Sequence, residues 1–431
     1  MKRLFIVMLV ISILVSSTSV GFSEGSYENF DITAESGIVI DAASGDILFE
    51  KNAHKPMYPA STTKVMTAVL TLENANLNDK VIIDKETPFT DGSRIYVKEG
   101  EVFTVEQLLN SVLIQSANDS AVALAKHISG SVEEFAKLMN KRAKELGALN
   151  TNFTNPHGLP DSEHVTTAYD LAMIGKYAMT IPKFREIVKT VKYQIPITEK
   201  TDEIRYLKNR NRLLWGVGPS NKMEYDGKLV DIKFDIVDGI KTGYTSEAQQ
   251  CLVSTASKDN RRVITVVLKA IKTNIYSDTR KLMEYGFDNF KVITVANSGT
   301  TLKTVPVENG IEETVDLVTQ DSISKTVLNQ YNQSDIAYKV EVEPQIVAPI
   351  NKGQLLGKVT YTLNGENVGE TSLIALQSID EKQIYKIIKK IKDPKNLNLV
   401  KILIGLVLLY VLWRTIVTVR RIRRKRRRWK W

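Results

Sequence analysis

The stretch Pro59-Ala60-Ser61-Thr62-Thr63-Lys64 begins the first long helical pattern of the chain. The offset of three residues places Lys64 one turn beyond Ser61 on the same helix face, so the serine hydroxyl has an amine within reach. A helix N-terminus also leaves backbone N–H groups unpaired, and these can stabilise negative charge on a carbonyl oxygen. An amine acts as a base only when neutral, which requires burial or a second cation nearby. Lys241 is the candidate for that cation.

This spacing is weak evidence by itself. Ser322-Ile323-Ser324-Lys325 has the same offset, and an isolated match of this kind usually reflects an N-cap serine followed by a surface lysine. Two further segments single out the first match. Ser116-Ala117-Asn118 begins 55 residues after Ser61, and Lys241-Thr242-Gly243 begins 125 residues after Ser116.

Strand patterns lie at both ends of the region that holds these motifs, and helical patterns lie between them. A hairpin is expected at 38–49 and later strands at 229–236, 251–255 and 263–268, the last followed by a helix at 278–285. This order predicts an α+β domain over residues 30–290, with a mainly antiparallel sheet and a helical subdomain. Short alternating strands over residues 292–376 predict a separate small all-β domain.

Both ends of the chain carry membrane-directed patterns. Lys2 and Arg3 precede the apolar run 4–15, which predicts an export signal over residues 1–23, or else an uncleaved anchor. Residues 397–419 predict a transmembrane helix whose apolar core is interrupted by Arg414; a helix lying in the interface is the alternative. Nine of the last twelve residues, 420–431, are Lys or Arg, which predicts a cytoplasmic tail and an extracytoplasmic body.

An amphipathic stalk is expected at residues 377–396, before the transmembrane helix. Isoleucines recur there at helical spacing among lysines, at positions 384, 387, 388 and 391. This face can rest on anionic lipid headgroups or pack on the preceding domain, and the pattern does not separate the two.

Charge and composition exclude several classes of protein. The net charge of +9 is concentrated in the C-terminal tail, whereas a nucleic-acid-binding domain carries its positive charge across a folded face. The single cysteine, Cys251, excludes an internal disulfide and is expected to be a buried structural thiol. The chain has four histidines, and His157 and His164 have no third ligand at a usable spacing, so we expect no metal and no cofactor.

Glu106-Gln107-Leu108-Leu109-Asn110 matches a β-lactamase deacylation string in the wrong order along the chain, and we interpret it as a helical core stripe.

Taken together, the motifs resemble the Ser-x-x-Lys, Ser-x-Asn and Lys-Thr-Gly signatures of the penicillin-binding and serine β-lactamase superfamily. A closer resemblance, over about residues 30–376, is to the low-molecular-mass serine D-alanyl-D-alanine carboxypeptidases. It rests on Pro59–Lys64, Ser116–Ala121, Asn155–Pro160, Asp238–Thr245 and Ala348–Gly353. The fold implied is a transpeptidase-like domain followed by a small all-β domain and a terminal membrane anchor.

The resemblance implies a role for each matching residue. Ser61 would be the acylated nucleophile, Lys64 its base and Ser116 a proton relay to the leaving amine. Substrate would be held by Asn118, Lys241, Thr242, Gly243 and Tyr244, and the backbone N–H groups of Ser61 and Tyr244 would form the oxyanion hole. The implied partners are peptidoglycan stem peptides ending in D-Ala-D-Ala, β-lactams as covalent inhibitors, and the membrane through the C-terminal helix.

One position departs from the family pattern. Many relatives carry an arginine about three residues before the position of Asp278, where this chain has Ile275; Lys269, Lys272 and Arg280 are the candidates to replace it. The motifs leave transpeptidase, endopeptidase and β-lactamase activity open beside carboxypeptidase activity. A non-catalytic sensor and a structural tether are the alternatives from other classes.

Overall fold

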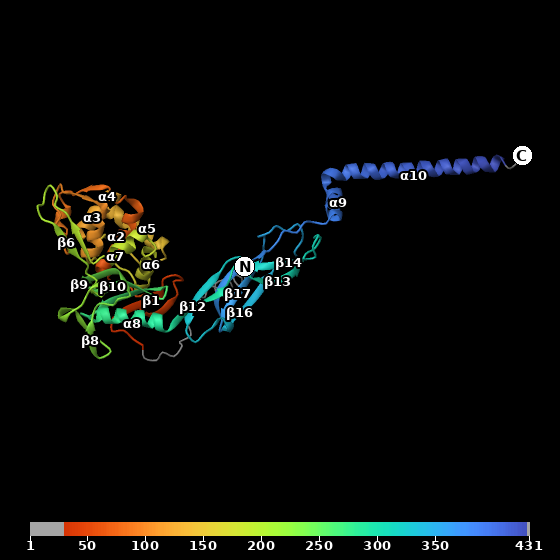
Figure 1. The fold of residues 1–431 in the computed structure, drawn as a ribbon. Coiled ribbons are helices and arrows are strands. Elements are labelled where there is room, and N and C mark those ends of the chain that lie inside the picture. The colour runs from red at the N-terminus through yellow and green to blue at the C-terminus, as the bar shows by residue number, and fades with distance from the viewer. Residues whose placement is uncertain (1–29, 429–431) are drawn as a thin grey trace, which may run out of the picture. The chain divides into compact units, whose positions relative to one another are not determined.

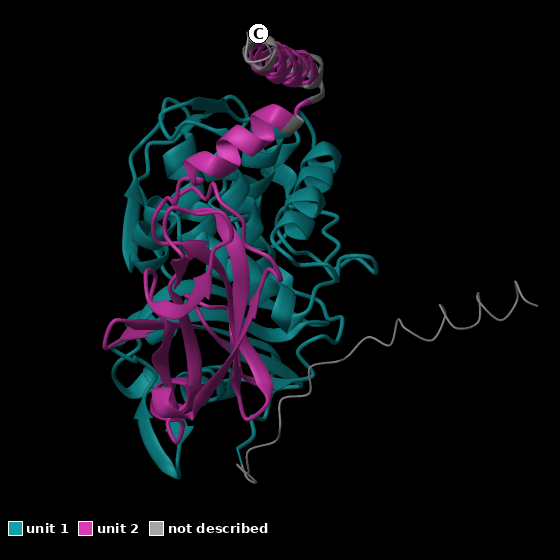
Figure 2. Cartoon of the chain, turned by 90° about the vertical axis from the view of Figure 1, so that its right-hand side faces the viewer, with its two compact units in different colours: residues 1–39, 50–256, 264–283 teal, residues 40–49, 257–263, 284–431 magenta. Residues whose placement is uncertain are grey.

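The computed structural model of the protein describes residues 30–428 (Figure 1). The expected signal at 1–23 lies outside the described residues. The chain forms two compact units (Figure 2). In the described part of the chain, the first unit comprises residues 30–39, 50–256 and 264–283, and the second comprises residues 40–49, 257–263 and 284 onward.

The central sheet draws its strands from both ends of the first region, as the sequence predicts. Its strand order is β2-β1-β11-β10-β9. The strands are β1 (Ser36–Asp41), β2 (Ile47–Lys51), β9 (Val237–Thr245), β10 (Gln249–Lys258) and β11 (Arg261–Ala270). Edge strand β9 pairs antiparallel with β10, with Lys241 opposite Val253.

A helical layer packs against this sheet (Figure 1). It contains α2 (Lys64–Asn74), α3 (Val105–Asn110), α4 (Asn118–Ser129), α5 (Val132–Glu145), α6 (Ala168–Ala178) and α7 (Pro182–Lys189). Helix α6 approaches the sheet closely, because a Cβ at Gly175 would lie 3.2 Å from Val253 and 3.4 Å from Ile264. Helix α8 (Asn274–Asp288) packs on β1, where a Cβ at Gly37 would lie 3.5 Å from Leu282. The predicted α+β class is therefore confirmed.

Three two-stranded antiparallel sheets complete the described part of the first unit. They are β3 (Lys80–Ile82) with β4 (Val102–Thr104), β5 (Lys192–Ile195) with β6 (Arg205–Lys208), and β7 (Lys222–Tyr225) with β8 (Lys228–Asp231). Short helical turns lie at η1 (Ala60–Thr63), η2 (Thr87–Phe89), η3 (Ser111–Gln115), η4 (Arg212–Leu214) and η5 (Pro219–Asn221).

The expected strand at 229–236 is wrong. Only its first residues are extended, in β8, and they pair with β7 rather than with the central sheet. The turn at Asp226-Gly227, with positive φ at both residues, folds the chain back on itself. The strand that joins the central sheet is β9. The sequence does not indicate this strand, because Gly239 and Gly243 lower the strand propensity of the segment.

The second unit contains a five-stranded sheet of order β13-β14-β18-β17-β16 and the pair β12-β15. Its strands are β12 (Phe290–Ala296), β13 (Thr301–Pro306), β14 (Thr314–Thr319), β15 (Ile323–Leu328), β16 (Ile336–Val342), β17 (Leu355–Leu363) and β18 (Glu366–Ala375), with the short turn η6 (Gln333–Asp335) before β16. Leu317, Val359 and Leu373 are buried in its core. Ile379, which lies in the expected stalk 377–396, is also buried in this core.

Two helices end the described chain. Helix α9 (Gln383–Lys392) keeps its four isoleucines between 38% and 62% exposed, so its apolar face is largely open. Helix α10 (Pro394–Arg428) contains a segment, Lys401–Arg424, that is long and apolar enough to cross a membrane.

Candidate active site

The predicted nucleophile and base lie together at the junction of η1 and α2. Ser61 is in the single turn η1, and Lys64 is the first residue of α2. The Lys64 Nζ atom lies 2.9 Å from Ser61 Oγ, within hydrogen-bond distance. The local offset of three residues therefore produces the pairing that the sequence predicts.

Lys64 is fully buried, and its environment favours the neutral amine. Burial lowers the pKa of Lys64 well below its usual value, and the positive charge of Lys241 lowers this pKa further, while Asp119 acts in the opposite direction. Nζ also donates a hydrogen bond to the His157 carbonyl oxygen, at 2.6 Å. A neutral amine that donates one N–H group to this oxygen still has a lone pair, which can accept the Ser61 hydroxyl proton.

The turn that carries His157 packs directly on the nucleophile turn. Gly158 has φ of +86°, and a Cβ at this position would lie 1.8 Å from the Ala60 carbonyl oxygen. The Thr67 hydroxyl donates to the Pro156 carbonyl oxygen at 2.6 Å, which ties the same turn to α2. This close approach explains why the segment Asn155–Pro160 belongs with the site.

Both histidines near the site are neutral and have structural contacts. His164 Nδ1 accepts from the Thr154 backbone N–H at 3.0 Å, and Nε2 lies 2.9 Å from Thr63 Oγ1. Since Thr63 donates its own hydroxyl proton to the Ala60 carbonyl oxygen, His164 Nε2 must be the donor in this pair. Burial lowers the pKa of His164 to about 4 and that of His157 to about 3. No group of three His, Cys, Asp or Glu residues that could hold a metal occurs within residues 30–428.

The Ser116-Ala117-Asn118 motif forms the junction between η3 and α4. Ser116 is buried with φ of 68°, and its hydroxyl makes no hydrogen bond to another described residue. Asn118 is buried; its Nδ2 donates to the Asp91 carbonyl oxygen at 2.6 Å. Because that oxygen is only an acceptor, the facing atom must be the amide nitrogen. The Asn118 Oδ1 atom is buried and has no hydrogen-bond partner in the part of the chain that is described.

The Lys-Thr-Gly motif lies within edge strand β9. Lys241 is buried, its Nζ donates to the Thr242 carbonyl oxygen at 2.8 Å, and burial followed by the charge of Arg210 lowers its pKa to about 7. A Cβ at Gly243 would lie 2.9 Å from the Ser61 backbone nitrogen, so glycine permits the strand to contact the nucleophile turn. The Thr242 side chain is half-buried and that of Tyr244 is 59% exposed.

The structure thus brings Ser61, Lys64 and Gly243 into direct proximity and places Lys241 within electrostatic reach of Lys64. Sequence reasoning missed Asp119 and Arg210, which act on the charges of these two lysines. The position of Asp119 directly after Asn118 was the one available signal for it. Nothing in the sequence pointed to Arg210.

Ile275 is buried on α8, and two of the candidates to replace the missing arginine are already engaged. Lys269 pairs with Glu35 at 2.6 Å, and the Arg280 guanidinium lies 4.5 Å above the Tyr225 ring. The Asp278 carboxylate has a structural role, because it accepts hydrogen bonds from the Thr33 and Ala34 backbone N–H groups.

The other sequence matches have structural explanations. Cys251 is buried, and burial raises the pKa of its thiol to about 12, as expected for an unreactive cysteine. Glu106 pairs with Lys183 at 2.6 Å, and Leu108 and Leu109 are buried in the helical core. Ser322 and Lys325 lie at strand β15 rather than on a helix; Ser322 accepts from the Ser298 backbone N–H, and Lys325 pairs with Asp46.

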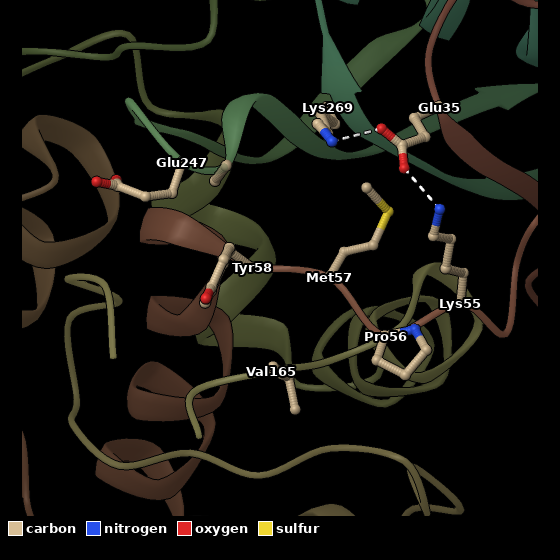
Figure 3. Close-up of a pocket in the computed structure, with 9 residues that line it drawn as sticks. Glu35, Lys55, Pro56, Met57, Tyr58, Val165, Glu247 and Lys269 are labelled. Carbon is tan, nitrogen blue, oxygen red and sulfur yellow. Dashed lines mark hydrogen bonds and ion pairs between the residues drawn. The ribbon is translucent and has the colours of Figure 1, made fainter. Parts of the chain in front are cut away.

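A pocket of about 370 Å³ lies at the segment before the nucleophile turn (Figure 3). Met57, Tyr58 and Val165 contribute to its lining, and the Glu35 carboxylate bridges Lys55 at 2.8 Å and Lys269 at 2.6 Å along one side. None of the predicted site residues lines this pocket, so it is separate from the Ser61–Lys64 pair.

Comparisons with known proteins agree with these motifs. The family model for D-alanyl-D-alanine carboxypeptidase, peptidase S11, matches residues 23–272, and that for the C-terminal domain of penicillin-binding protein 5 matches residues 290–381. The chain is 33% identical to the D-alanyl-D-alanine carboxypeptidase DacF of Bacillus subtilis, over 90% of this chain and 98% of that protein.

Two solved structures are similar to this one. Penicillin binding protein 5 from Haemophilus influenzae has a TM-score of 0.67 and 31% identity, covering 82% of this chain and 99% of that one. The Streptomyces K15 DD-transpeptidase has a TM-score of 0.54 and 32% identity, covering 60% of this chain and 99% of that one. With the resemblance confirmed over both domains, the chain belongs to the D-alanyl-D-alanine carboxypeptidase family and is a serine-type carboxypeptidase.

Proposed function

We propose that the protein removes the terminal D-alanine of peptidoglycan stem pentapeptides through an acyl-enzyme on Ser61. The observation that carries this proposal is the 2.9 Å separation of Ser61 Oγ from the buried amine of Lys64, whose pKa is lowered by burial and by the charge of Lys241. A serine hydroxyl is a weak nucleophile until a neighbouring base accepts its proton, and a desolvated lysine can be that base.

In the proposed acylation step, each motif residue has one role. Lys64 accepts the Ser61 proton while Ser61 Oγ attacks the carbonyl carbon of the penultimate D-alanine. The backbone N–H groups of Ser61 and Tyr244 stabilise the oxyanion, and Ser116 passes a proton to the departing D-alanine amine. The C–N bond breaks, the ester to Ser61 remains, and water hydrolyses it to return the free enzyme.

The remaining motif residues bind the substrate. Asn118 holds a peptide amide group of the acyl portion through the groups of its side chain that are not bound to Asp91. Lys241 and Thr242 hold the terminal carboxylate with a cation and a hydroxyl, and Gly243 gives the substrate backbone access to strand β9. Burial strengthens the Coulomb attraction between Lys241 and the carboxylate, although it also lowers the pKa of Lys241 to about 7.

β-Lactams fit the same scheme as covalent inhibitors, since their strained amide presents a carbonyl beside a carboxylate. Ring opening leaves the amine attached, so the acyl-enzyme is the expected trapped state.

The C-terminal helix α10 anchors the enzyme in a membrane. The segment Lys401–Arg424 is the spanning candidate, and the arginines after residue 419 support a cytoplasmic tail by the positive-inside rule. The catalytic unit then lies on the extracytoplasmic side, where peptidoglycan is found.

Release of D-alanine from a stem pentapeptide tests the proposal. Ser61→Ala should abolish release, and Lys64→Ala should slow it by about three or more orders of magnitude. Ser322→Ala is the matched control, because it removes the serine of the other Ser-x-x-Lys match and should leave the rate unchanged. Release that persists in Ser61→Ala would refute the assignment.

Transpeptidation is the second candidate, favoured by the similarity to the Streptomyces K15 DD-transpeptidase. The two reactions share the acyl-enzyme and differ in whether water or an amine accepts the acyl group. Supplying an amino-acid amine acceptor with the pentapeptide distinguishes them, because a transpeptidase would form the amide product while a carboxypeptidase would give mainly the hydrolysed tetrapeptide.

A further inference from the structure

A loop at residues 91–97 covers the buried end of Asn118. On its inner side the Asp91 carbonyl oxygen accepts from Asn118 Nδ2 and the Ser93 carbonyl oxygen accepts from the Asn118 backbone N–H, both at 2.6 Å. A Cβ at Gly92 would lie 2.6 Å from Asn118 Nδ2, so the loop has no room to move closer. The position of this loop therefore determines how the Asn118 amide is held.

Asp119 adds a second inner contact to the same loop. Its buried carboxylate accepts from the Ile95 backbone N–H at 3.1 Å and from the Val97 backbone N–H at 3.2 Å. These bonds satisfy backbone N–H groups of the loop. The carbonyl oxygens of Ile95 and Tyr96 need hydrogen-bond donors from another part of the chain.

Arg205, on β6, supplies those partners from the outer side. Its Nε donates to the Ile95 carbonyl oxygen at 2.9 Å and its Nη2 to the Tyr96 carbonyl oxygen at 3.2 Å. A planar guanidinium can bind two carbonyl oxygens and a carboxylate at once, which a lysine ammonium at the end of a flexible chain does not reproduce.

Glu101 holds the Arg205 guanidinium in place. The side chains of Glu101 and Arg205 are 0% and 10% exposed, and Nη2 lies 2.8 Å from Glu101 Oε2. The same carboxylate accepts from the Thr198 and Thr201 hydroxyls at 2.6 and 2.8 Å and from the Lys98 backbone N–H at 2.7 Å. A buried ion pair with this many additional hydrogen bonds has a defined geometry.

We infer that the Arg205–Glu101 pair is a positioning device that sets the Asn118 amide for substrate by clamping loop 91–97 from outside. The inference rests on the proposed substrate-binding role of Asn118. Arg205 and Glu101 do not touch the reacting atoms, so their effect passes through the loop. Loosening the pair shifts the Asp91 carbonyl oxygen and with it the amide that meets the peptide.

Arg205→Lys tests the inference by keeping the charge while removing the planar fork. We expect kcat/KM for D-alanine release to fall about 10- to 100-fold, because small displacements of a positioning group reduce rates on this scale. Hydrogen exchange in the peptide covering residues 91–97 should accelerate. Arg142→Lys is the matched control: Arg142 pairs with Glu73 at 2.7 Å in the same unit, and its variant should keep the wild-type kcat/KM.

A double-mutant cycle distinguishes positioning from general stability. In an Asn118→Ala background, Arg205→Lys should change kcat/KM less than twofold, because the group that it positions is already gone. An equal loss in both backgrounds, or unchanged kcat/KM in Arg205→Lys alone, would overturn the inference. If Arg205→Lys does not fold, Thr201→Val replaces it in the same cycle, because this variant removes one hydrogen-bond donor to Glu101. We expect a smaller loss of kcat/KM, and the same two results would overturn the inference.

Failure of the proposed function would appear as D-alanine release that persists in Ser61→Ala, or as no release by the wild-type protein. Failure of the substrate-binding role of Asn118 would look different again. In that case Asn118→Ala alone would release D-alanine at the wild-type rate, whereas failure of the present inference leaves Asn118→Ala impaired and Arg205 uncoupled from it.

Discussion

At the residue scale, the proposed mechanism gives opposite tasks to two buried lysines. Lys64 must be neutral to accept a proton, and Lys241 must be charged to bind a carboxylate. Burial lowers the pKa of both, and the charge of Lys241 lowers that of Lys64 further. Lys241 therefore helps to keep Lys64 neutral, whereas the pKa of Lys241 itself is set by burial and by Arg210.

These shifts predict a bell-shaped pH profile for kcat/KM. Activity should fall at low pH as Lys64 gains a proton, and at high pH as Lys241, with a pKa of about 7 in the free enzyme, loses its charge. Arg210 lowers the pKa of Lys241, so Arg210→Gln should move the basic limb to higher pH. Lys208→Gln, on strand β6, is the charge-matched control and should leave the limb in place. A basic limb that is identical in wild type and Arg210→Gln would contradict this account.

At the element scale, the site depends on the packing of the 155–158 turn against η1. The carbonyl oxygen of His157 binds the Lys64 amine, and His164 joins the Thr154 backbone to Thr63 in the nucleophile turn. This packing holds the Lys64 amine within hydrogen-bond distance of Ser61 Oγ.

Gly158→Ala should disrupt this packing. Its Cβ would lie 1.8 Å from the Ala60 carbonyl oxygen, and its φ of +86° disfavours any side chain. We expect a loss of roughly 2–4 kcal/mol in the free energy of unfolding, combining overpacking with backbone strain, and a large loss of acylation rate. Gly147→Ala is the control, because Gly147 has φ of +83° with no atom within 4 Å of the added Cβ. Chemical denaturation of both variants measures the difference, and equal losses would show that the contact with Ala60 contributes nothing.

The sequence predicts the parts of the site that are local along the chain. The Ser61–Lys64 pairing follows from helical spacing, and the α+β class follows from strands placed before and after helices. Contacts to backbone oxygens, such as Lys64 with His157 and Asn118 with Asp91, leave no side-chain signature and cannot be read from the sequence. Strand β9 was missed for a related reason, because its glycines are there for close packing against Val188 and η1 rather than for strand propensity.

At the scale of the whole molecule, the C-terminal helices carry the attachment to the membrane. The exposed isoleucines of α9 lie among lysines, and α10 contains a candidate membrane span of 24 residues, Lys401–Arg424. The two helices differ in kind, since α9 is amphipathic and suits a lipid surface, whereas α10 is long enough to span.

Truncation should separate these two contributions. A chain ending at Asp393 should lose its requirement for detergent but still bind vesicles containing anionic lipid, and salt should release it. A chain ending at Lys382 should remain in solution and should release D-alanine from a soluble pentapeptide at the full-length rate. Detergent-dependent solubility in the chain ending at Lys382 would contradict the assignment of α10 as the anchor.

The most direct test of the central claim is mass spectrometry of the penicillin-treated protein, with the modified peptide located after digestion. The account predicts one added penicillin on the peptide that contains Ser61, and no addition in Ser61→Ala. An adduct on any other residue, or no adduct in a preparation that still releases D-alanine, would contradict it.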